Sequence, residues 1–398
     1  MEKKRRNLIT VLFLSYLLLL SGCSKSSEGS SEEVSESTAE ESSETSQTAS
    51  SLTSVLDSSA MFTERDLLQA ADLSEATYIT VSDAADITIR SEGVYVLSGS
   101  AEDVTVIVDA ADAKVQIVLD GVSITNEGEA VIYVKDADKV FVTTSDTQNT
   151  FVVTGTFASD GDTNIDAAIF SLSDLTLNGI GTLNITSSAN GVTSKDDLKV
   201  TGGTYNITAA NHGLEGKDSV RIAGGEIVIN AKKDGIHSGN TEDSAKGYVY
   251  ISGGNISINA KSDGVQSVTV LQIDGGSLDI SASEGLESTY VIINDGNITI
   301  CASDDGINAS SKSKAYSPKI EINGGTLNID MGQGDTDALD ANGDLVITGG
   351  YITITAQFAF DFDGSVTFSG GTVIVNGEEV TTITNSMQMG GGFGGHGH

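Results

Sequence analysis

A glycine doublet recurs at a nearly constant interval through the second half of the chain. The doublets begin at residues 202, 224, 253, 275, 324, 349 and 370, and Asp295–Gly296 is a variant of the same signal. Each doublet is followed by a short alternation of apolar and polar residues, such as "EIVINA" at 226–231. Strict alternation points successive side chains to opposite faces, as in a half-buried β-strand. The period therefore predicts a repeat protein whose unit is built from short strands.

A second signal lies between the doublets and completes the repeat. It is a polar residue, a glycine and an aliphatic residue, as in "DGIH" at 234–237 and "DGVQ" at 263–266. Each unit then offers about three strands, and the absence of a helical period excludes βαβ units. We predict an all-β fold, a single-stranded right-handed parallel β-helix with about 21–22 residues per coil. A β-sandwich is the alternative, but it does not explain the fixed period.

The two ends of the chain have a different composition. The first residues, "MEKKRRNLITVLFLSYLLLLSGC", combine a basic start, an apolar run too short for a comfortable membrane span, and small residues before Cys23. We predict a lipoprotein signal peptide at 1–22 and lipidation of Cys23; an ordinary signal peptide with a chance cysteine is the alternative. Residues 23–58 are predicted to be a disordered Ser/Glu/Thr tether that begins with the lipidated cysteine, and residues 59–165 an N-terminal cap with the first coils. Residues 166–382 should form a regular β-helix that binds carbohydrate, and residues 383–398 a Gly-rich flexible tail.

A formal net charge of −35 restricts the partners of the chain. Such a surface repels nucleic acid and anionic lipid, so we expect no nucleic-acid partner and membrane contact through the N-terminal lipid only. These features predict an extracellular protein anchored to the bacterial cell membrane. Cys301 is the one cysteine besides Cys23, so no internal disulfide can form, and we expect Cys301 to be a small core residue.

The polar positions on either side of the Gly-aliphatic pair should form columns on neighbouring coils. Any single Asp-Gly is also a common turn dipeptide, so each aspartate taken alone could simply cap its turn. A column of carboxylates at a spacing of about 4.8 Å repels itself unless a cation compensates. Oxygen ligands without a Cys or His cluster favour Ca²⁺ over zinc. We predict roughly one to three Ca²⁺ ions along Glu284, Glu287, Asp305, Asn308, Asp337, Asp340, Asp361 and Asp363.

Two longer intervals are insertions at one place in the repeat. "NTEDSAK" at 240–246 and "SSKSKAYSP" at 310–318 are expected to leave the same turn of coils about two apart. Insertions in a solenoid gather on the binding face. The aromatic residues near them could stack on a sugar or pack between coils: Tyr248, Tyr250, Tyr290 and Tyr316. We interpret His212 and His237 as turn residues rather than metal ligands.

Several stretches, among them "NGVTSKDDLKVTGG", "HGLEGKDSVRIAGG" and "SDDGINAS", resemble the carbohydrate-binding β-helix lipoproteins of Gram-positive bacteria, over about residues 75–378. The resemblance implies a fold similar to that of pectate lyases and bound calcium. It also implies binding of cellulose-like or polygalacturonate-like polysaccharide rather than an established enzymatic activity. The chain departs from the pattern at Ala338 and Ala359, which replace the glycine of the repeat.

Three functions fit the sequence. We favour a non-catalytic cell-surface binder of plant-type or acidic polysaccharide, such as cellulose or polygalacturonate. A calcium-dependent pectate lyase is the second possibility, in which a basic residue abstracts the proton next to a uronate carboxyl group. A structural adhesin that binds a protein is the third. The lysines near the repeat signal fit solvated turn charges equally well, so we identify no residue as catalytic: Lys195, Lys217, Lys232, Lys233 and Lys246.

Overall fold

The computed structural model describes residues 55–332 and 336–386. The predicted signal peptide, Cys23, most of the predicted tether and residues 387–398 of the predicted tail lie outside the described residues. The described secondary structure is β throughout except for one short 3₁₀ helix, η1 (Ser58–Ala60). No helix in this part of the chain is long and apolar enough to cross a membrane.

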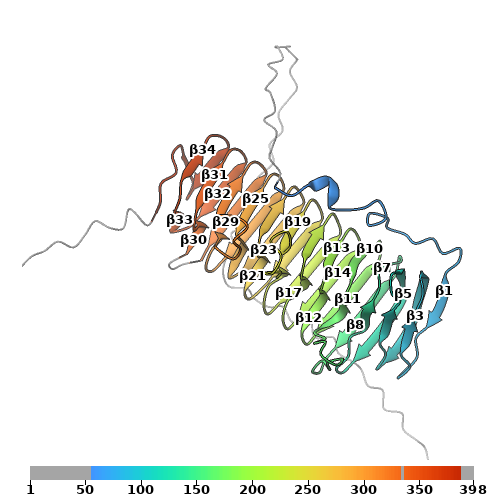
Figure 1. Cartoon of the computed structure of the whole chain (residues 1–398). Helices are drawn as coiled ribbons and strands as arrows, with labels where there is room; N and C mark the ends of the chain where they lie inside the picture. The colour runs from blue at the N-terminus through green and yellow to red at the C-terminus, as the bar shows by residue number, and fades with distance from the viewer. Residues whose placement is uncertain (1–54, 333–335, 387–398) are drawn as a thin grey trace, which may run out of the picture. The chain divides into compact units, whose positions relative to one another are not determined.

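The strands stack in three rows, and each regular coil contributes one strand to each row (Figure 1). Row 1 is a 12-stranded sheet of β2 (Ile87–Ile89), β4 (Val106–Asp109), β6 (Ile132–Asp136), β9 (Ala167–Ser171), β12 (Asn190–Ser194), β15 (Leu214–Gly216), β18 (Ile236–Ser238), β21 (Asp263–Ser267), β24 (Glu284–Ser288), β27 (Ile307–Ala309), β30 (Asp337–Ala341) and β33 (Phe358–Phe362). Row 2 holds β1 (Thr77–Thr80), β7 (Lys139–Thr144), β10 (Asp174–Gly179), β13 (Asp197–Val200), β16 (Ser219–Ile222), β19 (Tyr248–Ile251), β22 (Val270–Ile273), β25 (Tyr290–Ile293), β28 (Lys319–Ile322), β31 (Asp344–Ile347) and β34 (Val366–Phe368). Row 3 holds β8 (Gln148–Val153), β11 (Thr182–Ser187), β14 (Thr204–Ala209), β17 (Glu226–Ala231), β20 (Asn255–Asn259), β23 (Ser277–Ala282), β26 (Asn297–Ala302), β29 (Thr326–Met331), β32 (Tyr351–Thr355) and β35 (Thr372–Val375).

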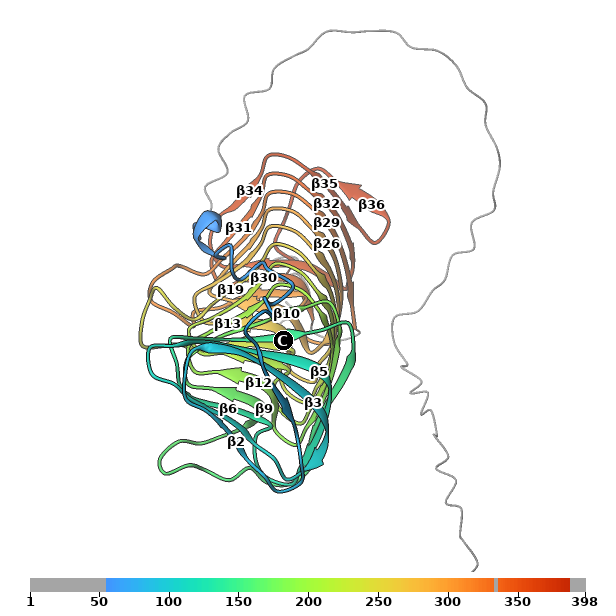
Figure 2. The same cartoon turned by 90° about the vertical axis from the view of Figure 1, so that its right-hand side faces the viewer.

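Two long strands near the N-terminal end join rows 2 and 3 into one 24-stranded sheet. They are β3 (Gly93–Glu102) and β5 (Lys114–Asn126), and each contributes its first half to row 2 and its second half to row 3. Pairings between successive coils are parallel, and β36 (Glu378–Val380) closes the last coil by pairing antiparallel with β35. Figure 2 shows the same stack turned by 90°. The prediction of an all-β chain of parallel strands is confirmed, whereas the predicted right hand of the coil stays a prediction.

The alternation in the sequence produces the core directly. In β17 the residues alternate between exposed and buried, so that Ile227 and Ile229 point inward while Glu226 and Val228 point out. The aliphatic residue of each repeat signal is buried in the same continuous core: Val192, Leu214, Ile236, Val265, Leu286, Ile307, Leu339 and Phe360. Because each coil covers the apolar face of the previous one, the coils stabilise one another.

The glycines of the repeat meet two different requirements. The second glycine of each doublet turns the chain between rows 2 and 3 with φ between +82° and +120°, a backbone region that disfavours residues with a Cβ. The glycine of the other signal lies where successive coils touch. A Cβ on Gly285 would lie 2.4 Å from the carbonyl oxygen of Gly306 and 2.5 Å from Cγ2 of Ile300.

Gly285→Ala should therefore destabilise the solenoid by about 1–3 kcal/mol, the usual cost of overpacking a close contact. Chemical denaturation measures the effect. Gly332→Ala is the matched control, because its added Cβ would meet only ordinary contacts at 3.5 Å. Equal stability of the two variants would show that the coils at Gly285 can separate without cost. Ala338, at the equivalent place two coils further on, shows that the stack accepts a methyl group where its geometry permits.

Residues 55–76, which we name the strap, lie along the outside of row 2 rather than across an end of the stack (Figure 1). Asp66 is the fixed point of the strap: it is fully buried and forms ion pairs with Lys139 and Lys199. Gln69 binds the next coils, since its amide donates to the carbonyl oxygen of Thr201 (3.0 Å) and accepts from the amide N–H of Gly179 (2.9 Å). The strap thus connects coils that are far apart in sequence from it.

The start of the predicted flexible tail is also docked on the solenoid. Ile383 is buried, and the amide N–H of Ser386 donates to the carbonyl oxygen of Phe360 (2.8 Å). The side chain of Asn385 donates to Asp361 (2.8 Å). The boundary placed at residue 383 was therefore wrong by at least these residues, whose backbone and side-chain contacts belong to the last coil.

Candidate functional site

The outward side of row 1 carries the predicted columns. Parallel register aligns Gln266, Glu287, Asn308, Asp340 and Asp361 on successive strands β21 to β33. A second set at the starts of these strands lies beside the first. We name as the acidic column the residues Asp263, Glu284, Glu287, Asp305, Asn308, Asp337, Asp340 and Asp361.

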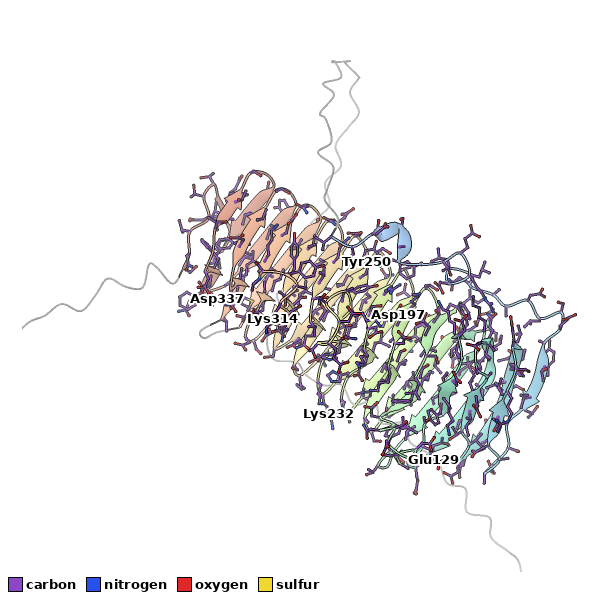
Figure 3. All side chains as sticks on the ribbon, viewed as in Figure 1. Glu129, Asp197, Lys232, Tyr250, Lys314 and Asp337 are labelled. Carbon is purple, nitrogen blue, oxygen red and sulfur yellow. The ribbon has the colours of Figure 1, made fainter. Side chains whose placement is uncertain are left out.

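The structure brings together seven of the eight residues predicted as calcium ligands. The eighth, Asp363, is exposed just beyond the end of β33, where its charge still contributes to the raised pKa of Asp340. The N-terminal end of the column gains Asp263, which was absent from the predicted set although it pairs in register with Glu284. Figure 3 shows that Asp337 lies in the coils toward the C-terminal end of the stack, whereas Glu129 lies toward the N-terminal end.

Neutral amides separate some of the carboxylates. The side-chain amide of Gln266 donates to Asp263 (2.8 Å) and to Glu287 (2.8 Å). The amide nitrogen of Asn308 donates to Glu284 (3.1 Å), while its amide oxygen is buried without a hydrogen-bond partner. Carboxylate oxygens of Asp263, Glu284 and Glu287 lie within 4.8 Å of one another. These carboxylate oxygens, together with the buried amide oxygen of Asn308 that accepts no hydrogen bond, fit the ligand preference of Ca²⁺.

Burial and crowding of the carboxylates raise their pKa values. Burial, followed by the charges of neighbouring carboxylates, raises the pKa of Asp263 to about 8 and that of Glu284 to about 7. Burial is also the largest cause in the later coils, where the pKa of Asp305 is raised to about 6 and that of Asp340 to about 7. The fully ionised column is therefore unfavourable without a counter-ion.

In the absence of metal, the protein should become more stable as the pH falls from about 8 to about 5. The folded column has pKa values of about 6 to 8, whereas the unfolded carboxyl groups have ordinary values of 3.8 and 4.5. The folded state thus binds more protons in this interval, which makes the free energy of unfolding rise on acidification, by on the order of 2 kcal/mol. Urea unfolding in chelator at several pH values measures it. A steady loss of stability over the same interval would contradict the assigned pKa shifts.

The two insertions form one pocket beside the acidic column. They are the loops 239–247, between β18 and β19, and 310–318, between β27 and β28, and both leave the turn from row 1 to row 2 as predicted. Together with Val268 and Thr269, from the first of the two coils between them, they line a pocket of about 470 Å³. The loop 310–318 is fastened to the solenoid by the hydroxyl of Thr289, which accepts the backbone N–H groups of Lys312 (3.1 Å) and Ser313 (2.8 Å).

Lys312 links this pocket to the acidic column. Its ammonium group lies 2.7 Å from a carboxylate oxygen of Glu287, and the residue also lines the pocket. Sequence reasoning missed Lys312, because the interval between repeat signals located the loop without giving the direction of its side chains. Of the lysines considered as bases, Lys195 and Lys246 pair with Glu215 and Asp218, which are not part of the acidic column.

The tyrosines do not form an open stacking platform. Tyr248 and Tyr250 are buried beneath the strap, where they pack with Met61 and Phe62. Tyr290 is half-buried, and its hydroxyl donates to Glu321. Their role is packing, which was the alternative left open by the sequence.

Comparison with known families gives a match over most of the solenoid. The family model described as carbohydrate-binding domain-containing protein matches residues 83–290 and 285–386, which together span most of the solenoid. The chain belongs to this carbohydrate-binding domain family. The family predicted from the sequence motifs is confirmed to that extent, whereas the lipoprotein, Gram-positive and calcium-containing character implied by the resemblance stays a prediction.

The proteins to which this carbohydrate-binding domain protein is similar include a bacterial protein and a solved structure. A carbohydrate-binding domain-containing protein of Acetivibrio thermocellus is 39% identical over 123 residues, which are 30% of this chain and 43% of that protein. The chain therefore matches less than half the length of that relative. A solved structure, that of the polysaccharide lyase-like protein from C. thermocellum as a gadolinium derivative, is 28% identical and superposes with a TM-score of 0.49 over 65% of this chain and 98% of that one.

Proposed function

We propose that this protein is a cell-surface lipoprotein that binds an acidic polysaccharide, of the polygalacturonate type, through calcium ions held on the acidic column. The observation that carries the proposal is the joint placement of the acidic column and the loop pocket, which share Lys312. A carbohydrate-binding domain gives the class of ligand, and the charge of the column gives the need for a cation. Cellulose is the alternative ligand within that class.

Calcium is the ion that the residues of the column fit best. They supply carboxylate oxygens and one buried amide oxygen without a partner, and they supply no sulfur or imidazole. The ion would neutralise the column and leave coordination positions for carboxylates of the glycan, which the bare protein would repel. Lys312 would contact the same carboxylates from the pocket side, because its ammonium group already lies against Glu287.

The remaining parts of the proposal concern the placement of the solenoid. We infer that the coil is right-handed, as parallel crossover connections nearly always are. The predicted lipid on Cys23 and the tether that follows would hold the solenoid away from the membrane surface. Incorporation of radiolabelled fatty acid into the chain, lost in Cys23→Ser, tests the anchor separately from the ligand.

Co-sedimentation with insoluble polygalacturonate and with cellulose tests the function, once in calcium and once in chelator. We expect retention on polygalacturonate in calcium and its loss in chelator. Retention that is equal in both buffers would remove calcium from the mechanism. No retention on either glycan would overturn the binding proposal and favour a protein partner. Soluble product that absorbs in the ultraviolet would instead show a lyase, because β-elimination leaves an unsaturated sugar.

A further inference from the structure

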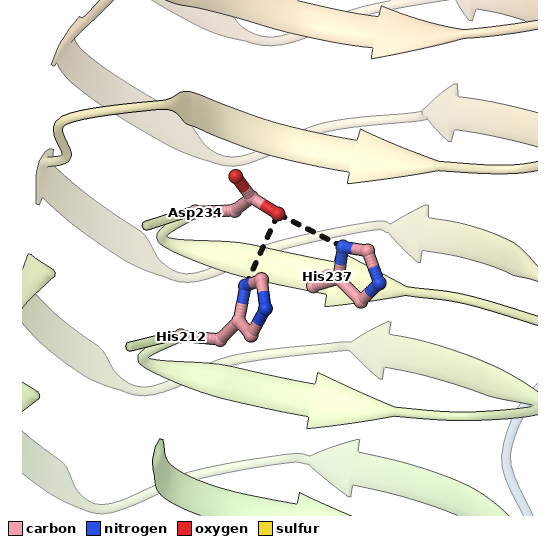
Figure 4. A group of neighbouring side chains, drawn as sticks. All are labelled: His212, Asp234 and His237. Atoms are coloured by element: carbon pink, nitrogen blue, oxygen red, sulfur yellow. Dashed lines mark hydrogen bonds and ion pairs between the residues drawn. The ribbon is translucent and has the colours of Figure 1, made fainter. Parts of the chain in front are cut away.

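Two histidines and an aspartate meet on row 1, on the N-terminal side of the acidic column (Figure 4). His212 lies two residues before β15, Asp234 two residues before β18, and His237 within β18. In the register of row 1, His237 lies between Glu215 and Gln266. The other coils of the column place carboxylates or amides at these positions, except for Phe358 in the last coil, so the pair of imidazoles is particular to this coil boundary.

The three side chains converge on one oxygen atom. Nδ1 of His212 lies 3.1 Å, and Nδ1 of His237 2.9 Å, from Oδ2 of Asp234. The two rings stack with their centroids 4.5 Å apart and an interplanar angle of 29°. The side chains of His212, Asp234 and His237 are only 14%, 6% and 19% exposed, respectively, so the cluster is largely shielded but not closed to solvent.

The carboxylate of Asp234 is held between the two rings and the next coil. His237 shares a hydrogen bond with Asp234, and Nδ1 of His212 is buried 3.1 Å from the same oxygen. The other oxygen of Asp234 accepts the backbone N–H of Asp263 (3.2 Å), so the carboxylate is oriented by the next coil. The carboxylate is thus held in place with two imidazole nitrogens directed at one of its oxygens.

The distances also agree with metal coordination. A tetrahedral ion with bonds of about 2.0–2.1 Å keeps its ligand atoms roughly 3.3 Å apart. The two separations from Oδ2 of Asp234 are 3.1 Å and 2.9 Å, so a small outward movement of the two rings would admit an ion. Imidazole nitrogen suits zinc and its neighbours in the periodic table, whereas calcium requires oxygen.

We propose that His212, Asp234 and His237 form a binding site for one divalent transition-metal ion of the zinc, cobalt or nickel class. Three protein ligands leave at least one coordination position open, which is the form of a site that can bind a further small ligand. The site is separate in chemistry from the calcium column, and its existence does not depend on calcium or glycan binding. The sequence prediction had treated both histidines as turn residues, because their convergence from two coils is visible only in the folded chain.

Cobalt titration of the full chain tests the proposal. The two other histidines of the sequence, His396 and His398, lie in the tail and could bind cobalt themselves, so the titration uses a background with both replaced by asparagine. In an excess of calcium we expect one Co²⁺ per chain, with a visible absorption band of a low-symmetry nitrogen and oxygen site. His212→Asn or His237→Asn should weaken cobalt binding by more than about 100-fold, because each removes a ligand.

Gln266→Asn is the matched control, since it changes the same column one coil further on and should leave cobalt binding unchanged. Circular dichroism of each variant without metal verifies that the fold is intact. Cobalt binding that survives in the variant with both His212→Asn and His237→Asn would overturn the proposal. Displacement of cobalt by a modest excess of calcium in the unsubstituted cluster would also overturn it, and this result needs no variant at the site.

Discussion

Saturating calcium should raise the melting temperature of the protein by about 5 °C or more relative to chelator. An ion present at a thousand times its dissociation constant stabilises the folded state by about 4 kcal/mol, and each kcal/mol shifts the melting temperature of a domain this large by roughly 1.5 °C. The unfolded chain does not hold the carboxylates of the acidic column together, so it cannot compete for the ion. Differential scanning calorimetry in calcium and in chelator measures the shift.

Asp340→Asn should affect the stability of the protein differently in chelator and in calcium. In chelator the variant should be at least as stable as the natural chain, because burial and then the neighbouring carboxylates disfavour the charged form of Asp340 and raise its pKa. In calcium it should lose part of the stabilisation, since an amide is a weaker ligand than a carboxylate. Asp279→Asn, on the exposed side of row 3, is the control and should keep the full shift. An identical calcium shift in Asp340→Asn would exclude Asp340 from the site.

Asp66→Asn should release the strap, at a cost of about 3–5 kcal/mol. The substitution removes the anionic partner of Lys139 and Lys199, whose side chains are 10% and 7% exposed, and leaves their buried charges without it. Because the strap can open while the solenoid stays folded, we expect tryptic cleavage at Arg65 to become about 10²–10³-fold faster. Glu64→Gln removes an exposed charge of the same segment and is the control. Cleavage at the same rate in both variants would show that Asp66 does not hold the strap.

The same carboxylate gives the docking of the strap an acid limit. Burial by itself raises the pKa of Asp66, but the hydrogen bonds from Lys139 and from the backbone of Thr63, together with the two ammonium charges, outweigh it and lower the pKa to about 2. Since the unfolded value is 3.8, the stabilisation is fully present above about pH 4 and is lost as the pH falls toward 2. This loss runs opposite to the gain expected from the metal-free acidic column at higher pH.

The parts of the fold that follow from local rules could be predicted from the sequence. Alternation in segments such as Glu226–Ala231 gave the inward and outward faces, and the second glycine of each doublet gave the turn between two rows because only glycine tolerates its positive φ. Equal spacing then aligned the outward columns, so that most of the acidic column was correctly placed.

Features that depend on side-chain direction across coils could not be predicted. The contact of Lys312 with Glu287 requires the path of an inserted loop, and the burial of Asp66 requires a polar segment to dock on distant coils. The convergence of His212 and His237 on Asp234 depends on the rotamers of three residues from two coils. None of these arrangements leaves a periodic signal, because each occurs once in the chain.

The most direct test of whether calcium on the acidic column joins the protein to its glycan is the dissociation constant of calcium. Titration calorimetry measures it with and without soluble oligogalacturonate. Binding linkage is reciprocal, so a bridging ion must bind more tightly in the presence of the glycan, by the same factor by which calcium tightens glycan binding. We predict such tightening, and its loss in Asp340→Asn. A calcium dissociation constant that does not change when the glycan is bound would contradict the account.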